Sequence, residues 1–243
     1  MPNHITNVLS AEGAPDEVRR FFTAIDGGKD ENGQPMYIDF NKIRPMPESL
    51  NVESGSRNDR ALDYYVINRI KQSDAAAVSM MLGDYTGNVF RRLPETLARK
   101  RYNYDADEMP ELLNFGERLF NNIRNYGAPT WYEWSIQSWG TKWNAYDQER
   151  IDDNAIKFLT AWSGVPGLIQ ELSGQFPDVT MSYTFADENW GSNVGDFEFK
   201  NGECILDHQP PDNSPDARII AEELLGPPCS NEDEDEEDWE DEV

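Results

Sequence analysis

Residues 179–206 read VTMSYTFADENWGSNVGDFEFKNGECIL and contain the clearest strand pattern of the 243-residue chain. Apolar and polar side chains alternate over the first part of this stretch, and the apolar ones are Val179, Met181, Tyr183 and Phe185. A period of two predicts a strand with one buried face. Asn201-Gly202 then separates two short strand candidates, 196–200 and 203–206, and Asn-Gly is the strongest short hairpin signal. The stretch therefore predicts a strand followed by a hairpin.

The first fifty residues predict a β-α-β order. Residues 4–10 alternate like a short strand, and Pro15 with the acids after it begins a helix that ends at Gly27-Gly28. One face of this helix is apolar and consists of Val18, Phe21, Phe22 and Ile25. Residues 37–43 are predicted to be extended up to the prolines that follow them, because proline cannot continue a strand ladder.

The region between the two ends lacks strand alternation at first and predicts a helical block. Its predicted helices span 58–72, 73–83, 94–100 and 110–125. The aromatic run 131–136 then predicts a strand, and the polar residues 152–154 are N-cap candidates for a helix that begins near Ile156. Residues 164–167 interrupt this helix before its apolar face resumes, and a last helix is predicted over 214–225.

The order β-α-β, helical block, β-α-β-β is a split β-α-β unit that occurs twice, which is the ferredoxin-like plan. We therefore predict an α+β fold with a single ferredoxin-like domain over residues 1–228. Its halves are 1–50 and 130–228, and residues 51–129 form a helical insertion. Residues 229–243 form an acidic tail, which we expect to be disordered because it cannot bury enough apolar surface.

The charge of the chain is strongly negative and unevenly distributed. The net charge is −25, from 46 Asp and Glu against 21 Lys and Arg. Residues 131–228 carry 17 acidic and 5 basic side chains, and the tail adds 10 acidic and no basic ones. Such a chain is repelled by nucleic acids and by anionic membranes. The arginine- and lysine-rich segment 91–101 is followed directly by acids, so we expect charge pairing there and no direct binding of nucleic acid.

Four segments carry a resemblance to a known family: Met1–Leu9 (MPNHITNVL), Phe40–Pro47 (FNKIRPMP), Trp139–Tyr146 (WGTKWNAY) and Phe158–Ser163 (FLTAWS). They resemble the YubB ferredoxin-like (Api-type) family of phage- and plasmid-encoded proteins. The resemblance implies a ferredoxin-like domain from a mobile element, and it implies no catalytic residues. We interpret the following motif residues as structural: Asn3, His4, Asn7, Trp139, Gly140, Thr141, Lys142, Trp143 and Asn144.

Motifs for catalysis, nucleotides and metals are missing or incomplete. The chain has no GxxxxGK[ST] or GxGxxG loop and no G-x-S-x-G elbow. Its two histidines, His4 and His208, and its two cysteines, Cys204 and Cys229, form neither a triad nor a zinc pattern. We therefore predict that the protein is not an enzyme and that it has no cofactor and no metal site.

The string Trp139–Asn144 has two interpretations. In the first it is a structural turn that packs two tryptophan rings over a sheet edge. In the second it is an aromatic recognition patch with Trp190 as a neighbour. The first is the interpretation that we favour.

The function predicted from these features is binding without catalysis. We expect a counter-defence inhibitor, resembling DNA in its acidic charge, that occupies a basic, nucleic-acid-binding surface of a bacterial defence protein in the host cytoplasm. The N-terminus lacks a signal-peptide layout, and no membrane partner is expected. The predicted contact residues are Asp187, Glu188, Trp190, Asp196, Glu198, Glu203, Asp207, Glu232, Asp233, Glu234, Asp235, Glu236, Glu237, Asp238 and Trp239.

Two alternatives stay open. One is a metal-dependent enzyme built on Asp147, Asp152, Asp187 and Glu188, which would have to converge in the fold. The other is a structural or assembly factor of a phage.

Overall fold

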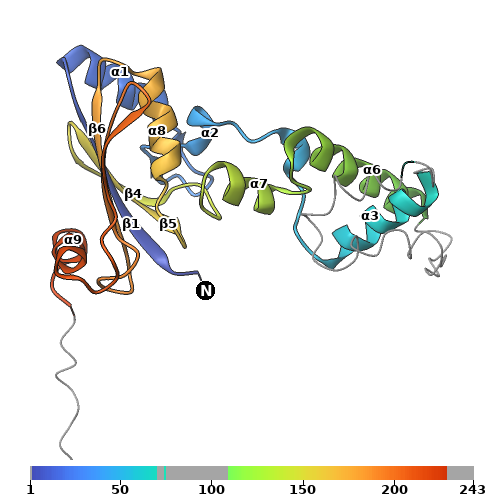
Figure 1. Ribbon diagram of the computed structural model, residues 1–243. Helices are drawn as coiled ribbons and strands as arrows, with labels where there is room; N and C mark the ends of the chain where they lie inside the picture. The colour runs from blue at the N-terminus through green and yellow to red at the C-terminus, as the bar shows by residue number, and fades with distance from the viewer. Residues whose placement is uncertain (1, 70–73, 75–108, 229–243) are drawn as a thin grey trace, which may run out of the picture.

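The computed structural model describes residues 2–69, 74 and 109–228 (Figure 1). A six-stranded sheet forms one body, and a pair of helices from the middle of the chain lies to one side of it. The predicted helix 94–100, the tail 229–243 and all of the predicted helix 73–83 except residue 74 lie outside the described residues.

All neighbouring strands of the sheet are antiparallel, and their order is β4-β5-β1-β6-β7-β8. The strands are β1 (His4–Glu12), β4 (Tyr146–Asp152), β5 (Ala155–Ala161), β6 (Thr180–Asp187), β7 (Gly195–Lys200) and β8 (Glu203–His208). The register of the central strand places Leu9 opposite Ile156 on one side and Tyr183 on the other.

Four strands and two helices form the predicted ferredoxin-like plan. β1 continues through α1 (Pro15–Ile25) towards β4, and β5 lies between these two strands in the sheet. β5 continues through α8 (Pro166–Gln175) to β6, and β1 lies between them. Because each connection skips one strand, both β-α-β units are split, which confirms the ferredoxin-like α+β fold. The β7–β8 hairpin extends the sheet beyond β6.

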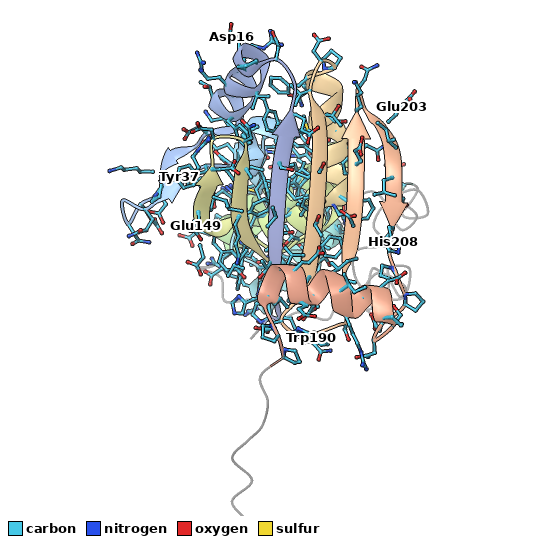
Figure 2. The ribbon with its side chains drawn as sticks, turned by 90° about the vertical axis from the view of Figure 1, so that its left-hand side faces the viewer. Asp16, Tyr37, Glu149, Trp190, Glu203 and His208 are labelled. Atoms are coloured by element: carbon cyan, nitrogen blue, oxygen red, sulfur yellow. The ribbon has the colours of Figure 1, made fainter. Side chains whose placement is uncertain are left out.

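The main core lies between the sheet and the helices α1 and α8, which cover the same face (Figure 1). Phe21 of α1 and Leu168 of α8 pack there against Leu9, Phe158 and other inward-facing strand residues. The opposite face of the sheet is crossed at one end by α9 (Pro215–Leu225) (Figure 2). There α9 buries its alanines and Ile220 against Ala186 and Val194.

A buried hydrogen-bond network crosses the centre of this core. The Nδ2 group of Asn7, which is fully buried, donates to the main-chain oxygens of Ile5 and Phe158. Its Oδ1 atom accepts a hydrogen bond from the Tyr183 hydroxyl at 2.5 Å, and that hydroxyl accepts one from the Val165 N–H at 2.6 Å. Buried polar groups are tolerated when they are paired in this way, and Asn7 links β1 to β5 and β6 through these bonds.

The connection between α1 and β4 leaves the sheet and returns to it. It begins with the β2–β3 hairpin (Gly28–Lys29 and Pro35–Met36) and continues through α2 (Phe40–Ile43) and the 3₁₀ helix η1 (Glu48–Leu50). After the helical block, α7 (Trp131–Ser138) leads back to β4.

The helical block consists, where the structure describes it, of α3 (Ser56–Arg69) and α6 (Met109–Tyr126), which share a separate core. The two helices approach so closely that a Cβ atom at Gly116 would overlap the main-chain oxygen of Ala61. Asn122 and Arg118 of α6 donate to the Ser49 oxygen and so tie the block to η1. No helix in these described parts is long and apolar enough to cross a bilayer.

Several predicted elements are confirmed. The strand over 4–10, the helix beginning at Pro15, the strand and hairpin of 179–206 and the helix over 214–225 are all present. Predicted helices 58–72 and 110–125 correspond to α3 and α6 within a few residues.

Three predicted elements are wrong. Residues 131–136 are helical, and Thr130 is the N-cap: its side chain accepts from the Tyr132 N–H and bonds the Glu133 carboxylate. Residues 153–154 form the tight turn between β4 and β5, so Ile156 lies in a strand that begins at Ala155 and not in a helix. Residues 37–43 contain the short helix α2, because Asp39 caps it at the Asn41 N–H.

Candidate functional site

A groove of about 980 Å³ lies beside β4, at one edge of the sheet. One wall comes from the β2–β3 hairpin, within residues 30–36, and the other from residues 143–148, which lead into β4. We call this feature the acidic groove. It joins segments that lie more than a hundred residues apart in the chain.

Side-chain amides hold the two walls together. Gln148 accepts a hydrogen bond from the Ile38 N–H at 2.8 Å and donates one to the Ile38 oxygen at 2.9 Å. Asn144 accepts from the Phe40 N–H at 2.9 Å and donates to the Asp39 carboxylate at 2.8 Å. These paired amides fix residues 38–40, which directly follow the hairpin wall, against the wall formed by residues 143–148.

Carboxylates give the groove a negative charge. Asp30, Glu31 and Asp147 line it, and its lining contains no lysine or arginine. The Asp30 carboxylate accepts the N–H groups of Asn32 and Gln34, which shapes the hairpin loop. Asp147 is exposed and has a φ of 45° at an irregularity of the β4 ladder. The concentration of negative charge attracts cations to the groove.

Two aromatic rings complete the lining. Trp143 and Tyr146 meet edge to face, with ring centroids 6.1 Å apart, and 37% of Trp143 is exposed. The Tyr146 hydroxyl lies 2.7 Å from His4 Nδ1 and donates to the Thr160 oxygen at 3.3 Å. Burial raises the pKa of Tyr146, and the carboxylates of Asp147 and Glu188 raise it further. The hydroxyl therefore stays protonated at neutral pH.

An exposed aromatic cluster adjoins the groove through Trp143. The Lys142 ammonium lies 4.5 Å from the ring centroid of Trp143, 5.0 Å from that of Trp162 and 5.9 Å from that of Tyr132. Trp162 is 39% exposed. The contacts with Lys142 are cation–π interactions, so the cluster is a rigid neighbour of the groove.

The backbone of Trp162 is held in an unusual conformation. Its φ of 73° lies in the left-handed region, which bulky residues rarely adopt. Its N–H donates to the Asn3 oxygen, and its own oxygen accepts from the side chain of Asn193. The Asp187 carboxylate accepts from the side chains of both Asn3 and Asn193. Asp187 therefore organises the residues that hold Trp162.

The first half of the Trp139–Asn144 string is structural, as the favoured interpretation has it. Trp139 is buried and its indole N–H donates to the Arg44 oxygen. Gly140 has a φ of 83°, and the buried Thr141 hydroxyl donates to the Ala161 oxygen. The second half differs, because Trp143 and Asn144 line the acidic groove. The string thus contains both a structural turn and part of the groove lining.

Two predicted contact residues have internal roles. Asp187 is only 5% exposed, and its hydrogen bonds to Asn3, Asn189 and Asn193 occupy its carboxylate, so it is not offered to a partner. The Trp190 indole donates to the Gly226 oxygen and packs against the α9 cluster. Burial of a carboxylate with three donors satisfies its charge inside the fold.

The remaining predicted carboxylates of the body do not line the acidic groove. Glu188 is exposed just after β6. Asp196 and Glu198 on β7 share one face, and Asp196 accepts from the Thr184 hydroxyl. Asp207 on β8 points to the opposite face, because it pairs with Phe197. Glu203 is exposed at the start of β8 (Figure 2).

These carboxylates therefore do not form one row. The tail residues Glu232–Trp239 lie outside the described residues.

The enzyme alternative is not supported by the arrangement of its carboxylates. Asp147, Asp152, Asp187 and Glu188 do not gather, and within the described ranges no group of three or more His, Cys, Asp or Glu could hold a metal ion. His208 lies 3.6 Å from Asp216, and Cys204 is exposed. Slight burial and the Asp207 charge raise the pKa of the Cys204 thiol, which makes it a poorer nucleophile.

Several residues of the groove were missed from the sequence. Asp30, Glu31 and Gln148 had no predicted role. The usable signal was the pattern Asp30-Glu-Asn-Gly-Gln34, which is typical of a tight turn that places acids at its tip. No local signal shows that this tip meets Trp143.

Comparison with known proteins gives the following findings. Residues 138–226 match the family model described as "Ferredoxin-like domain in Api92-like protein". A search of solved structures finds the crystal structure of a protein Api92 from Yersinia pseudotuberculosis, at 10% identity and a TM-score of 0.41. The alignment covers 88% of this chain and 100% of that chain. A search of curated proteins finds no match.

The stretch 138–226 contains β4 to β8 and one wall of the acidic groove, and it is similar to the ferredoxin-like domain of Api92-like proteins. This supports the Api-type part of the resemblance. The YubB resemblance and the phage or plasmid context stay predictions.

Proposed function

We propose that the protein binds a basic segment of a partner protein and that the acidic groove holds lysine or arginine side chains of that segment. The observation that carries the proposal is the composition of the groove. Three carboxylates and two aromatic rings line one cavity that has no lysine or arginine in its lining. Cations bind carboxylates by charge-assisted hydrogen bonds and aromatic faces by cation–π contacts.

The frame of the groove favours a specific contact over loose attraction. Gln148 and Asn144 hold residues 38–40 against the wall 143–148 by four hydrogen bonds of 2.8–2.9 Å. Binding therefore costs little additional conformational entropy. The cation–π contacts of Lys142 with Trp143 and Trp162 limit the movement of the Trp143 ring. A fixed aromatic ring at the rim of a charged groove has the features of an interface anchor.

The overall charge supports rapid association with a basic partner. At a net charge of −25, long-range attraction raises the rate of encounter, whereas the groove supplies short-range selectivity. Asp196, Glu198 and Glu203 enlarge the negative surface without sharing the groove. In this proposal the overall charge therefore raises the association rate, and the shape of the groove determines selectivity.

We infer that the partner is a bacterial host protein whose basic surface normally contacts nucleic acid. The inference rests on the resemblance to phage- and plasmid-encoded proteins and on the negative charge, which has the sign of DNA phosphates. Inhibition of a defence protein in the host cytoplasm is the role that such a partner implies. Capture from a defence-bearing host at low and at high salt tests it, and an affinity that salt leaves unchanged contradicts it.

Calorimetry with a synthetic peptide tests the groove directly. We expect the full-length protein to bind an arginine-rich peptide saturably and to leave a glutamate-rich peptide of equal length unbound. Trp143→Ala is expected to weaken binding about tenfold, because it removes the exposed ring of the groove.

Trp162→Ala is the matched control, because Trp162 is equally exposed but does not line the groove. It is expected to change the affinity less than about threefold, which corresponds to the loss of a neighbouring contact. Equal losses for the two variants, or binding that neither one affects, would contradict the groove as the site.

A further inference from the structure

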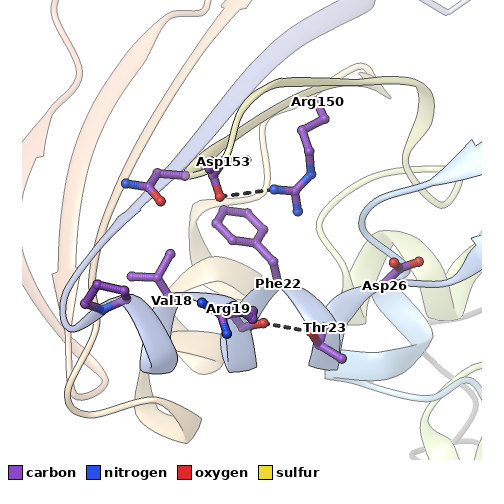
Figure 3. Close-up of a pocket in the computed structure, with 9 residues that line it drawn as sticks. Val18, Arg19, Phe22, Thr23, Asp26, Arg150 and Asp153 are labelled. Atoms are coloured by element: carbon purple, nitrogen blue, oxygen red, sulfur yellow. Dashed lines mark hydrogen bonds between the residues drawn. The ribbon is translucent and has the colours of Figure 1, made fainter.

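A second pocket, of about 370 Å³, lies between α1 and the turn that joins β4 to β5 (Figure 3). Val18 and Phe22 of α1 form its apolar side, and Arg150 and Asp153 lie opposite them. The groove residues 143–148 do not line this pocket, and it played no part in the sequence analysis. It is therefore a separate candidate for ligand binding.

Arg150 is fixed on one side and open on the other. Its guanidinium carbon lies 4.8 Å from the Phe22 ring centroid and 5.8 Å from that of Tyr37. Its Nη1 atom donates to the main-chain oxygens of Asp152 and Asp153, at 3.4 and 3.1 Å. Among the residues that the structure describes, no carboxylate forms an ion pair with it. The remaining guanidinium donors can accept a carboxylate from a ligand.

Asp153 presents the opposite charge in the same pocket without neutralising Arg150. Only its main-chain oxygen contacts Arg150, and across the described part of the chain its carboxylate has no ion pair. The other charged residues of the pocket are partly engaged. Arg19 lies 3.5 Å from Asp16, and Asp26 accepts a hydrogen bond from the Gly28 N–H. The pocket thus keeps one cation and one anion apart and available.

We propose that this pocket binds a small zwitterion with the chemistry of an α-amino acid. The ligand carboxylate would meet Arg150, its ammonium group would meet Asp153, and an apolar side chain would lie on Val18 and Phe22. A simple anion would be repelled by Asp26 and Asp153, and a simple cation by Arg19 and Arg150. A ligand that carries both charges satisfies the two sides at once.

The test is an NMR titration of the full-length, ¹⁵N-labelled protein with L-phenylalanine. Saturable shifts of the Val18, Phe22 and Asp153 amide signals are expected, with a dissociation constant of about 1 mM, as two charge-assisted contacts in an open pocket provide. N-acetyl-L-phenylalanine lacks the ammonium charge and L-phenylalaninamide lacks the carboxylate. Each is expected to bind at least about tenfold more weakly.

Two variants assign the charges. Arg150→Gln and Asp153→Asn are each expected to weaken L-phenylalanine binding about tenfold. Arg20→Gln is the matched control, since Arg20 lies on α1 outside the pocket and pairs with Glu17. If Arg150→Gln disturbs the packing on Phe22, the exposed Asp153→Asn variant still tests whether the charges of the pocket bind the ligand. Absence of saturable shifts, or equal binding of L-phenylalanine and its acetylated analogue, overturns the proposal.

Discussion

At one edge of the sheet, β4 and the β2–β3 hairpin place Asp30, Glu31 and Asp147 around two aromatic rings. At the other edge, β8 carries Glu203 and Asp207 on an exposed strand. Both edges are acidic, but their side-chain amides differ in what they hold: Gln148 and Asn144 join β4 to residues 38–40 by four hydrogen bonds, whereas Gln170 donates one hydrogen bond to Gly202 in the β7–β8 turn. The contrast teaches that negative charge marks much of this surface, whereas a binding site also needs fixed geometry.

The largest expected effect comes from loosening the frame of the groove. Gln148→Ala removes both hydrogen bonds to Ile38, so the hairpin wall can move away from β4. Binding of the arginine-rich peptide is expected to fall at least about tenfold, and the free energy of unfolding to fall by about 1–2 kcal/mol. Calorimetry and urea unfolding measure the two quantities.

The matched control is Gln209→Ala beside β8, where the amide donates only to the exposed Asp207 carboxylate. It is expected to leave both quantities nearly unchanged. A similar loss of binding at both positions would mean that the two edges do not differ in the way we propose.

A smaller effect is expected from neutralising one carboxylate at each edge. Asp147→Asn removes a charge from the groove lining, and binding is expected to weaken about threefold to tenfold. Asp207→Asn removes an exposed charge from the other edge and is expected to cost less than about twofold. The reverse order would favour the acidic β7–β8 surface that we predicted from the sequence.

The fold was predictable where one local pattern dominated. The alternation that ends in Phe185 and the Asn201-Gly202 turn each determine their structure within a few residues, and both predictions are confirmed. Predictions were wrong where the residue composition of a segment favoured one element and a capping residue beside it favoured another. The aromatic run after Thr130 resembles a strand, but Thr130 caps a helix there by accepting from the Tyr132 N–H.

The candidate site was only half predictable, because its walls meet through long-range contacts. The unusual string containing Trp143 could be recognised as a possible patch from its composition. Its partner wall at Asp30 could not, since their proximity depends on Gln148 contacting Ile38, 110 positions away. Asp187 was misjudged for the same reason: acidic neighbours suggested exposure, whereas Asn3 and Asn193 bury it.

The acidic tail allows a test of the overall charge that leaves both sheet edges unchanged. Deletion of residues 229–243 removes ten carboxylates and leaves the groove residues intact. Association with the basic peptide is expected to slow about twofold to threefold, with a weaker salt dependence and an almost unchanged dissociation rate. Stopped-flow measurements at two salt concentrations separate these rates. A faster dissociation that Trp239→Ala reproduces would show instead that the tail makes a direct contact.

The smallest expected effect concerns pH and again distinguishes the edges. Burial and the nearby carboxylates raise the pKa of Tyr146 in the folded protein above its value of about 10 in the unfolded chain. The stabilisation by its neutral hydroxyl is therefore fully present below about pH 10 and is lost as the pH rises through the folded-state value. Tyr146→Phe lacks this loss, so its difference in unfolding free energy from the wild type should shrink as the pH rises above about 10. Urea unfolding below and above this pH measures the difference, and Gln209→Ala beside β8, which removes no titrating group, serves as the comparison. A constant difference for Tyr146→Phe would mean that the hydroxyl is not held beside His4 and Thr160 in solution.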